Sequence, residues 1–298
     1  MKPKRSQLTD ALGMTHRNRV APERRFVMRK VMLVLALLTT ALAATATTPF
    51  AAAESTVDEE PGVIRTEERN CFETLDSRPV LLEQAEAYVP DRYTVRSFAA
   101  PPPPAWTGPP DARIAQVSFT DYVCESVAVN GHEAQPTIVS LGTVLVTRDE
   151  APVTVVLWVG TNNPLLFARL TQLGVNAYFV PHSSVSESTD ALGRRVIDVV
   201  VGGGPPQGLH HSRSITVLSA PPGPTRTSTG TFYHLGDRGE VVFTYANTLL
   251  PNGSANISID VDPNSIADAV YGLTSFVFPA PRNFFQGGWD GTIELVSP

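Results

Sequence analysis

Lysine is almost missing from this sequence. Its three lysines, Lys2, Lys4 and Lys30, all precede residue 54, and residues 54–298 hold 14 arginines against 27 aspartates and glutamates, a formal charge of −13. A region of this charge is a poor binder of phosphate backbones or anionic lipid surfaces, so we exclude nucleic acid as a partner. A P-loop is excluded as well, because that motif needs a lysine.

Motifs that bind cofactors or metals are also missing. The glycine run at 202–204 is followed by Pro205 and Pro206, which do not let a helix begin in the usual way, so it is no dinucleotide fingerprint. His210 and His211 are adjacent and would point to opposite faces of a strand. No H-x-H, HExxH or C-x-x-C spacing supports zinc, and no G-x-S-x-G turn marks a nucleophile. We therefore expect neither a metal nor a cofactor.

The first 53 residues have the order of a secretory signal peptide. A basic region ends at residue 30, an uncharged stretch follows over Val31–Ala53, and acidic residues begin at Glu54. Ala51 and Ala53 form an A-x-A site, which predicts cleavage between Ala53 and Glu54, and ATA at Ala44–Ala46 is a second candidate site. The alternative is a retained anchor, the one expected contact with a membrane. However, the strongly apolar part, Val31–Leu38, is shorter than the roughly 20 residues that span a bilayer.

Whether the two cysteines are expected to form a disulfide depends on whether the protein is exported. The Arg24-Arg25 pair lacks the Ser or Thr usual before a twin-arginine signal, so we expect Sec-type export to a secreted or extracytoplasmic location. In that compartment Cys71 and Cys124 are expected to form a disulfide, and the alternative is two separate buried thiols. Closing a loop of about fifty residues would stabilise the fold by roughly 3–4 kcal/mol.

Four segments are expected along the chain. Residues 1–53 are the signal peptide, and residues 54–75 are an acidic, flexible lead-in without a hydrophobic period. Residues 76–110 combine a short helix with a proline-rich connector. Residues 111–298 carry about ten short strand patterns and two short helices, one of them over Asn162–Gly174. This pattern predicts a mostly β (α+β) fold, with an antiparallel sheet closed or nearly closed into a barrel.

The candidate catalytic residues are two acids that interrupt an apolar strand, together with a nearby arginine. Asp121 and Glu125 are four residues apart and share one face of a regular strand, which Arg113 precedes. If that face lines a cavity, a raised carboxyl pKa would suit acid–base work. If it faces water, which we favour, the acids are solubilising charges, because carboxylates are rarely buried unpaired.

A second group of residues is expected to line a pocket or its lip. The loop after the glycine run would cover a barrel mouth, with His210 or His211 reaching inward, and Trp158 and Phe119 lie on apolar strands. Their residue types suit the wall of a pocket for a small apolar or amphiphilic molecule.

From about Arg113 to the C-terminus the sequence resembles the acetoacetate decarboxylase-like β-barrel family. The likeness lies in the long strand ARIAQVSFTDYVCESVAV, an Asn-Gly hairpin, the strand VVLWVG, the helix NPLLFARLTQLG and a closing strand near Trp289. The resemblance implies a β-barrel with a pocket. The decarboxylases of that family use a lysine Schiff base, which a region without lysine does not allow.

Three functions remain open from the sequence. The first is an exported protein that binds a small apolar or amphiphilic ligand inside its sheet. The second is a lysine-independent lyase or hydrolase that uses Glu125 or Asp121 with Arg113. The third is an extracellular protein-interaction module. The sequence leaves the oligomeric state open.

Overall fold

The computed structural model describes residues 62–98, 108–203, 208–219, 226–272, 275–277 and 282–296. The expected signal peptide, its cleavage site between Ala53 and Glu54, the first part of the acidic lead-in and most of the proline-rich connector lie outside these ranges. Among the described residues, no helix is both long enough and apolar enough to cross a membrane.

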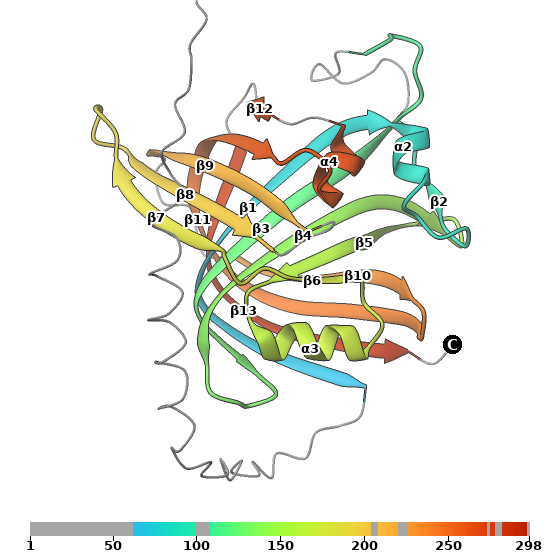
Figure 1. Cartoon of the computed structure of the whole chain (residues 1–298), viewed down its shortest axis with the longest axis horizontal. Coiled ribbons are helices and arrows are strands. Elements are labelled where there is room, and N and C mark those ends of the chain that lie inside the picture. Colours follow the sequence, from blue (N-terminus) through green and yellow to red (C-terminus); the bar gives the residue numbers. More distant parts are fainter. Residues whose placement is uncertain are drawn as a thin grey trace, which may run out of the picture. The chain divides into compact units, whose positions relative to one another are not determined.

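Strands dominate the described part of the chain (Figure 1). The helices are α2 (Leu82–Glu86), α3 (Pro164–Gln172) and α4 (Ile266–Tyr271). The strands are β1 (Val63–Leu81), β2 (Thr94–Val95), β3 (Ile114–Val129), β4 (Gln135–Arg148), β5 (Ala151–Thr161), β6 (Ala177–Phe179), β7 (Ser184–Thr189), β8 (Arg195–Gly202), β9 (His210–Ser219), β10 (Arg226–Gly236), β11 (Gly239–Val261), β12 (Ser275–Val277) and β13 (Arg282–Val296).

Seven of these strands form a ring of hydrogen bonds. Their order is β10-β5-β4-β3-β1-β13-β11, and β11 pairs back with β10. The neighbours are antiparallel except β10 and β5, whose parallel pairing covers two residue pairs, Phe232 with Thr154 and Tyr233 with Val155. The predicted mostly β fold with short helices is therefore confirmed, and its sheet is a hydrogen-bonded ring closed by one short parallel contact rather than a strict barrel.

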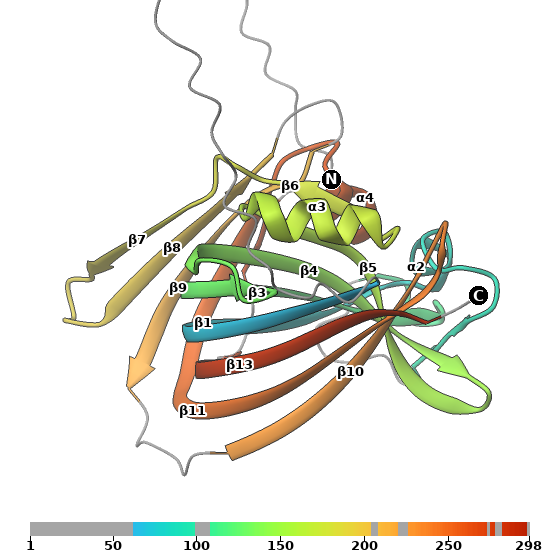
Figure 2. The same cartoon turned by 90° about the horizontal axis from the view of Figure 1, so that it is seen from below.

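The sheet continues beyond the ring because β11 is long. The first half of β11 pairs with β10, and its second half, from Gly253 to Val261, pairs with β9. Strands β8 and β7 follow β9 in antiparallel order, and Figure 2 shows these three strands extending away from the ring strands. We call strands β7, β8 and β9 the flap.

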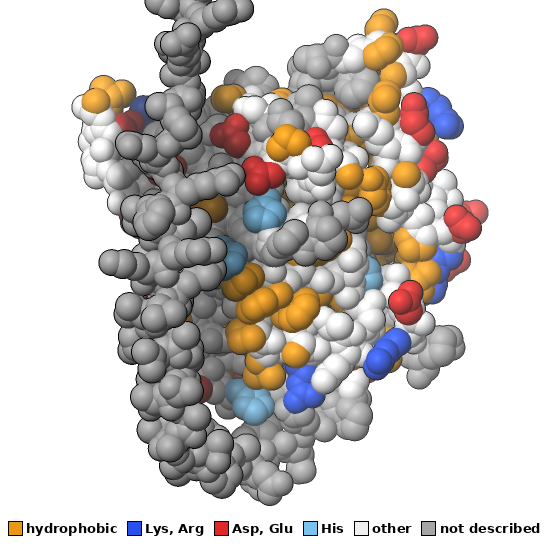
Figure 3. Space-filling model, viewed as in Figure 1, with side chains coloured by type: hydrophobic (Ala, Val, Ile, Leu, Met, Phe, Trp, Pro, Cys, Tyr) orange, Lys and Arg blue, Asp and Glu red, His pale blue; other side chains and the backbone are white. Residues whose placement is uncertain are grey.

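The strands bury apolar side chains in two clusters. One cluster packs Leu166 and Leu170 of α3 against strands of the ring, and we call it the helix core. The other, which we call the flap core, joins ring strands to β8, β9, α2 and α4. Cys71 belongs to the helix core and its neighbour Phe72 to the flap core, so β1 is a wall between the two. Hydrophobic side chains also gather on the face over α3 and β6 (Figure 3).

Two local predictions are confirmed. Asn130 and Gly131 both have positive φ, 50° and 73°, as a type I′ turn between β3 and β4 requires. The side chain of Asn163 accepts hydrogen bonds from two backbone N–H groups in the first turn of α3, both at 3.1 Å. Gly174, with φ 81°, follows the end of that helix.

The structure differs from the prediction before residue 82. Residues 63–75, expected to be a flexible lead-in, belong to β1, which lies between β3 and β13. Asp76–Leu81 continue that strand, so the helix expected from Asp76 begins only at Leu82. The acidic residues obscured the strand pattern, because acids usually indicate exposed chain, whereas Glu68 is half-buried and Glu73 is buried.

Candidate functional site

A cavity lies between α3 and the ring strands. Aliphatic side chains from β4, β5 and α3 form much of its wall. The space that the centres of water molecules can occupy inside it is about 80 Å³. A water needs about 10–15 Å³ on this measure, so the cavity holds roughly five to eight waters. Its five aromatic lining residues are Tyr122, Phe232, Phe243, Tyr245 and Trp289.

Glu68 is the ionisable carboxyl among the lining residues, and none of the described lining residues is Lys, Arg or His. Its position depends on a β-bulge, because the pairing of β1 with β13 shifts register between Glu68 and Cys71. Asn70, inside the bulge, has φ 50°. The extra residue lets Glu68 and Cys71, three residues apart, turn toward the same core, which strict alternation would forbid.

A disulfide lies directly beside this carboxyl. Cys71 and Cys124 are opposite each other on β1 and β3 and are bonded, as the sequence predicted. The Cys124 Sγ is 3.8 Å from Glu68 Oε2. Glu68 and the two sulfurs lie within 4.8 Å of one another, a spacing that suits a metal only with free thiolates, and in this structure the sulfurs form the disulfide.

The environment of Glu68 and Glu73, two of the four acids of β1, favours their neutral forms. Burial raises the pKa of Glu68 to about 7 and the charge of Asp290 adds to this, whereas the Thr66 hydroxyl and Arg69 act in the opposite direction. Thr66 Oγ1 donates to Glu68 Oε1 at 3.2 Å. Burial likewise raises the pKa of Glu73 to about 7, against the effect of its hydrogen bond with Tyr122. Both carboxyls therefore titrate close to neutral pH.

Tyrosines complete the polar part of the site. Burial raises the pKa of Tyr122 well above its ordinary value, and Glu73 raises it further. Burial, followed by the charge of Glu73, also raises the pKa of Tyr245. Both phenols thus stay protonated and can donate or accept hydrogen bonds. The site offers two carboxyls that hold or release a proton near pH 7, beside two phenols and apolar walls.

Three of the predicted site residues meet in a different place, inside the flap core. The Nε2 atom of His211 is 3.2 Å from both carboxylate oxygens of Asp121, and its ring lies 4.5 Å from that of Phe119. Arg213, which the sequence prediction missed, places its Nε 3.1 Å from Asp121 Oδ2 and an amino group 2.9 Å from Asp76 Oδ2. All of these side chains are buried, so the favoured expectation that Asp121 faces water is wrong, because Arg213 and His211 pair with its carboxylate.

The charges of this cluster keep Asp121 ionised. Burial alone would raise the pKa of Asp121, but Arg213, His211 and the Ser140 hydroxyl together outweigh it and lower the pKa to about 2. A carboxylate that releases its proton so readily is poorly matched to acid–base work near neutral pH. Trp158 is fully buried nearby, with its ring 6.1 Å from that of Phe119.

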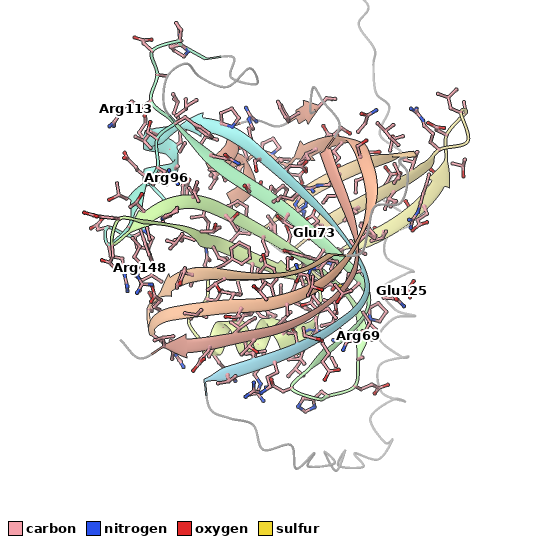
Figure 4. The ribbon with its side chains drawn as sticks, turned by 180° about the vertical axis from the view of Figure 1, so that it is seen from behind. Arg69, Glu73, Arg96, Arg113, Glu125 and Arg148 are labelled. Atoms are coloured by element: carbon pink, nitrogen blue, oxygen red, sulfur yellow. A yellow bond between two sulfur atoms is a disulfide. The ribbon has the colours of Figure 1, made fainter. Side chains whose placement is uncertain are left out.

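The other predicted site residues lie apart. Arg113 precedes β3 and Glu125 lies toward its other end, both exposed (Figure 4). Asn70 donates to Glu125 Oε2 at 3.0 Å, across the position where β3 also shifts register against β4. His210 is partly exposed, 3.8 Å from Asp262 Oδ2, whereas His211 is buried, so the adjacent histidines point to opposite sides. Catalytic or pocket roles for these residues remain predictions.

Thr66, Glu68 and Glu73 are not predicted as site residues because the composition of residues 54–75 indicates an acidic, flexible segment. The stretch Ile64–Glu68 does alternate, with Ile64 and Thr66 buried between exposed residues, but the density of charge obscured this. The predicted disulfide does indicate order in this segment. A bond from Cys71 to Cys124 requires the residues around Cys71 to lie beside the strand that contains Cys124.

Comparisons with known proteins give a likeness of structure and none of sequence. No protein-family model matches the chain, and no curated protein matches it.

An acetoacetate decarboxylase from Legionella pneumophila has a TM-score of 0.44 at 8% identity, covering 78% of this chain and 87% of that one. An acetoacetate decarboxylase-like enzyme from Sphingomonas wittichii has a TM-score of 0.43 at 9% identity, covering 79% and 92%. The enduracididine biosynthesis enzyme MppR, complexed with pyruvate, has a TM-score of 0.45 at 10% identity, covering 85% and 96%. The chain thus has a remote structural resemblance to acetoacetate decarboxylase-like proteins.

Proposed function

We propose that the protein binds a small amphiphilic molecule in the cavity under α3. The observation that carries this proposal is the composition of the cavity wall, which is mostly apolar and aromatic and includes a carboxyl, Glu68, that Thr66 hydrogen-bonds. Ligand sites typically combine apolar walls with a small number of placed polar groups that orient the ligand.

The two ends of such a ligand would meet different parts of the wall. Leu166 and Leu170 of α3, with Val156 and Val159 of β5, offer the apolar part. Glu68, with the phenols of Tyr122 and Tyr245 in the same wall, offers the polar part. The volume, equal to roughly five to eight waters, restricts the ligand to a small molecule.

A cavity-filling variant tests this proposal. In Leu166→Trp, the larger side chain should occupy the cavity, whereas Ala168→Trp places the same group on the exposed side of the same helix. Small fragments screened by ligand-observed NMR should bind the unmodified protein and Ala168→Trp, and should lose binding in Leu166→Trp. If no fragment binds the folded protein, or if both variants bind equally well, the cavity is not the ligand site.

We also propose that the protein is exported and that cleavage leaves Glu54 as its first residue. The order of charges and apolar residues before Glu54 supports this, and so does the Cys71–Cys124 disulfide, since such bonds persist in oxidising compartments. Sequencing the N-terminus of protein recovered outside the cytoplasm should read Glu-Ser-Thr-Val. A mature protein that still carries Lys30 would contradict cleavage.

A second candidate function is acid–base catalysis by the carboxyls of β1. General acids and bases work best when their pKa is near the working pH, and the pKa values of Glu68 and Glu73 are both about 7. If a lyase or hydrolase activity is found, its rate should fall at least tenfold in Glu68→Gln and should be unchanged in Glu125→Gln. The reverse result would return the catalytic role to Glu125.

A further inference from the structure

We propose that the ligand of the cavity is a small methylated ammonium cation, held between the carboxylate of Glu68 and the aromatic rings around it. The inference rests on the proposed function, because it names the chemical class of the molecule that the cavity would bind. Three observations lead to it: the sign of the charges at the site, the aromatic wall and the scarcity of hydrogen-bonding partners.

The carboxyl that lines the cavity and the acids near it favour a cation. Glu68 lines the cavity, and Glu73 and Asp290 are close enough to influence its titration or to be influenced by it. Arg69, the cation that acts on the titration of Glu68, is exposed, and its guanidinium pairs with Asp290 at 2.7 Å and with Glu67 at 3.4 Å. An anionic ligand would therefore meet acids whose neighbouring cation is already paired, which is costly where water is scarce.

The aromatic rings supply the second part of the site. The rings of Tyr122 and Trp289 lie 5.7 Å apart, and those of Phe232 and Tyr245 lie 5.1 Å apart. All four residues line a cavity of only about 80 Å³, so a molecule inside it is within a few ångströms of several rings at once. Quaternary and methylated ammonium groups are attracted to the electron-rich faces of such aromatic rings.

The number of hydrogen-bond acceptors in the cavity wall determines whether a primary or a methylated ammonium ion fits better. A primary ammonium has three donors that need acceptors once it leaves water. The surface of the cavity is mostly apolar, so acceptors for three N–H groups are scarce there. A fully methylated ammonium has no N–H to satisfy and loses less when it is buried among apolar side chains. The wall therefore suits a methylated cation better than a primary amine.

The cation should bind more tightly as the pH rises through neutrality. The cation needs the ionised form of Glu68. The groups around this carboxyl are the Thr66 hydroxyl, the Tyr122 phenol, the Cys71–Cys124 disulfide and the charged side chains of Arg69, Glu73 and Asp290. Of these, Glu73 titrates in the same range, and its ionisation would also favour a cation. Binding should thus release protons between pH 6 and pH 8.

The test uses three probes of the same shape and different charge. Choline is the cation, 3,3-dimethylbutan-1-ol is its neutral isostere and 3,3-dimethylbutanoate carries the opposite charge. Each is titrated into the full mature protein by calorimetry at pH 6 and pH 8. At pH 8, choline should bind at least tenfold more tightly than the neutral isostere, and the anion should bind most weakly. At pH 6 the advantage of choline should shrink.

Variants on one strand provide the controls. Glu68→Gln keeps the shape of the side chain and removes its charge, so choline and the neutral isostere should then bind within twofold of each other. Glu67→Gln changes the adjacent residue, whose side chain is 68% exposed, and should retain the preference for choline. Near-ultraviolet circular dichroism checks that both variants are folded.

The outcomes separate this inference from the proposed function. If the neutral isostere or the anion binds the unmodified protein as tightly as choline, the cation inference is wrong and the ligand site stands. If no probe binds the folded protein, the cation inference fails, and the fragment screen on Leu166→Trp and Ala168→Trp then decides the proposed function by itself.

Discussion

Replacing Glu73 by glutamine is expected to reduce the loss of stability that the protein undergoes between pH 5 and pH 8. Glu73 is 9% exposed, and its pKa is about 7 in the folded protein against 4.5 as its ordinary value. Above pH 4.5 the unfolded chain releases this proton while the folded protein retains it, so the free energy of unfolding falls as the pH rises. The penalty is absent below pH 4.5 and complete above pH 7.

The magnitude follows from the two pKa values. A difference between about 7 and 4.5 corresponds to about 3 kcal/mol, an upper figure because Glu68 titrates in the same range and is coupled to Glu73. In a domain of this size, that equals a change in melting temperature of roughly 6–12 °C. Glutamine does not ionise and can still hydrogen-bond to Tyr122, so the variant should lose up to about 3 kcal/mol less than the unmodified protein.

Urea denaturation at pH 5, 6, 7 and 8 measures this difference directly. The exposed acid Glu125 provides the control, and Glu125→Gln should follow the pH curve of the unmodified protein. The reasoning is refuted if the curves of Glu73→Gln and the unmodified protein remain parallel from pH 5 to pH 8. That result would mean that Glu73 ionises as easily in the folded protein as in the unfolded chain.

Three other changes should destabilise the fold to different degrees. Reducing the bond between Cys71 and Cys124, which are 53 residues apart, should cost about 4 kcal/mol by loop entropy, measured by urea denaturation with and without a reductant. Arg213→Met removes the cation between buried carboxylates and should cost about 3–5 kcal/mol, and a loss below 1 kcal/mol would contradict the buried ion cluster. Gly142→Ala would place a methyl group 2.2 Å from the ring of Trp158, so we expect a cost of about 1–3 kcal/mol, with a lower melting temperature in calorimetry.

The parts of the fold that the sequence predicted well depend on neighbouring residues. Asn130-Gly131 specifies its hairpin because few other residue pairs tolerate positive φ at both positions. Asn163 and Gly174 delimit α3 through contacts within a few residues. The disulfide followed from the number of cysteines and the expected compartment, and the structure contains it.

The parts that sequence reasoning missed depend on distant pairings. Asp121 was placed correctly on a strand, but the residue that neutralises it, Arg213, lies on β9, 92 positions away along the chain. Glu68 looked like one acid among several in a polar lead-in. Its role in the cavity depends on a bulge in β1 and on partners from β3 and β13, which no local pattern announces.

By itself, the sequence determined the local elements: the turns, the caps of α3, the alternation within strands and the absence of lysine chemistry in residues 54–298. Those features arise from interactions between residues close in the chain, or from composition alone. Only the tertiary structure decided which acids leave bulk water. The desolvation of Glu68 and Glu73, and the neutralisation of Asp121, arise where strands far apart in sequence enclose the same carboxyl.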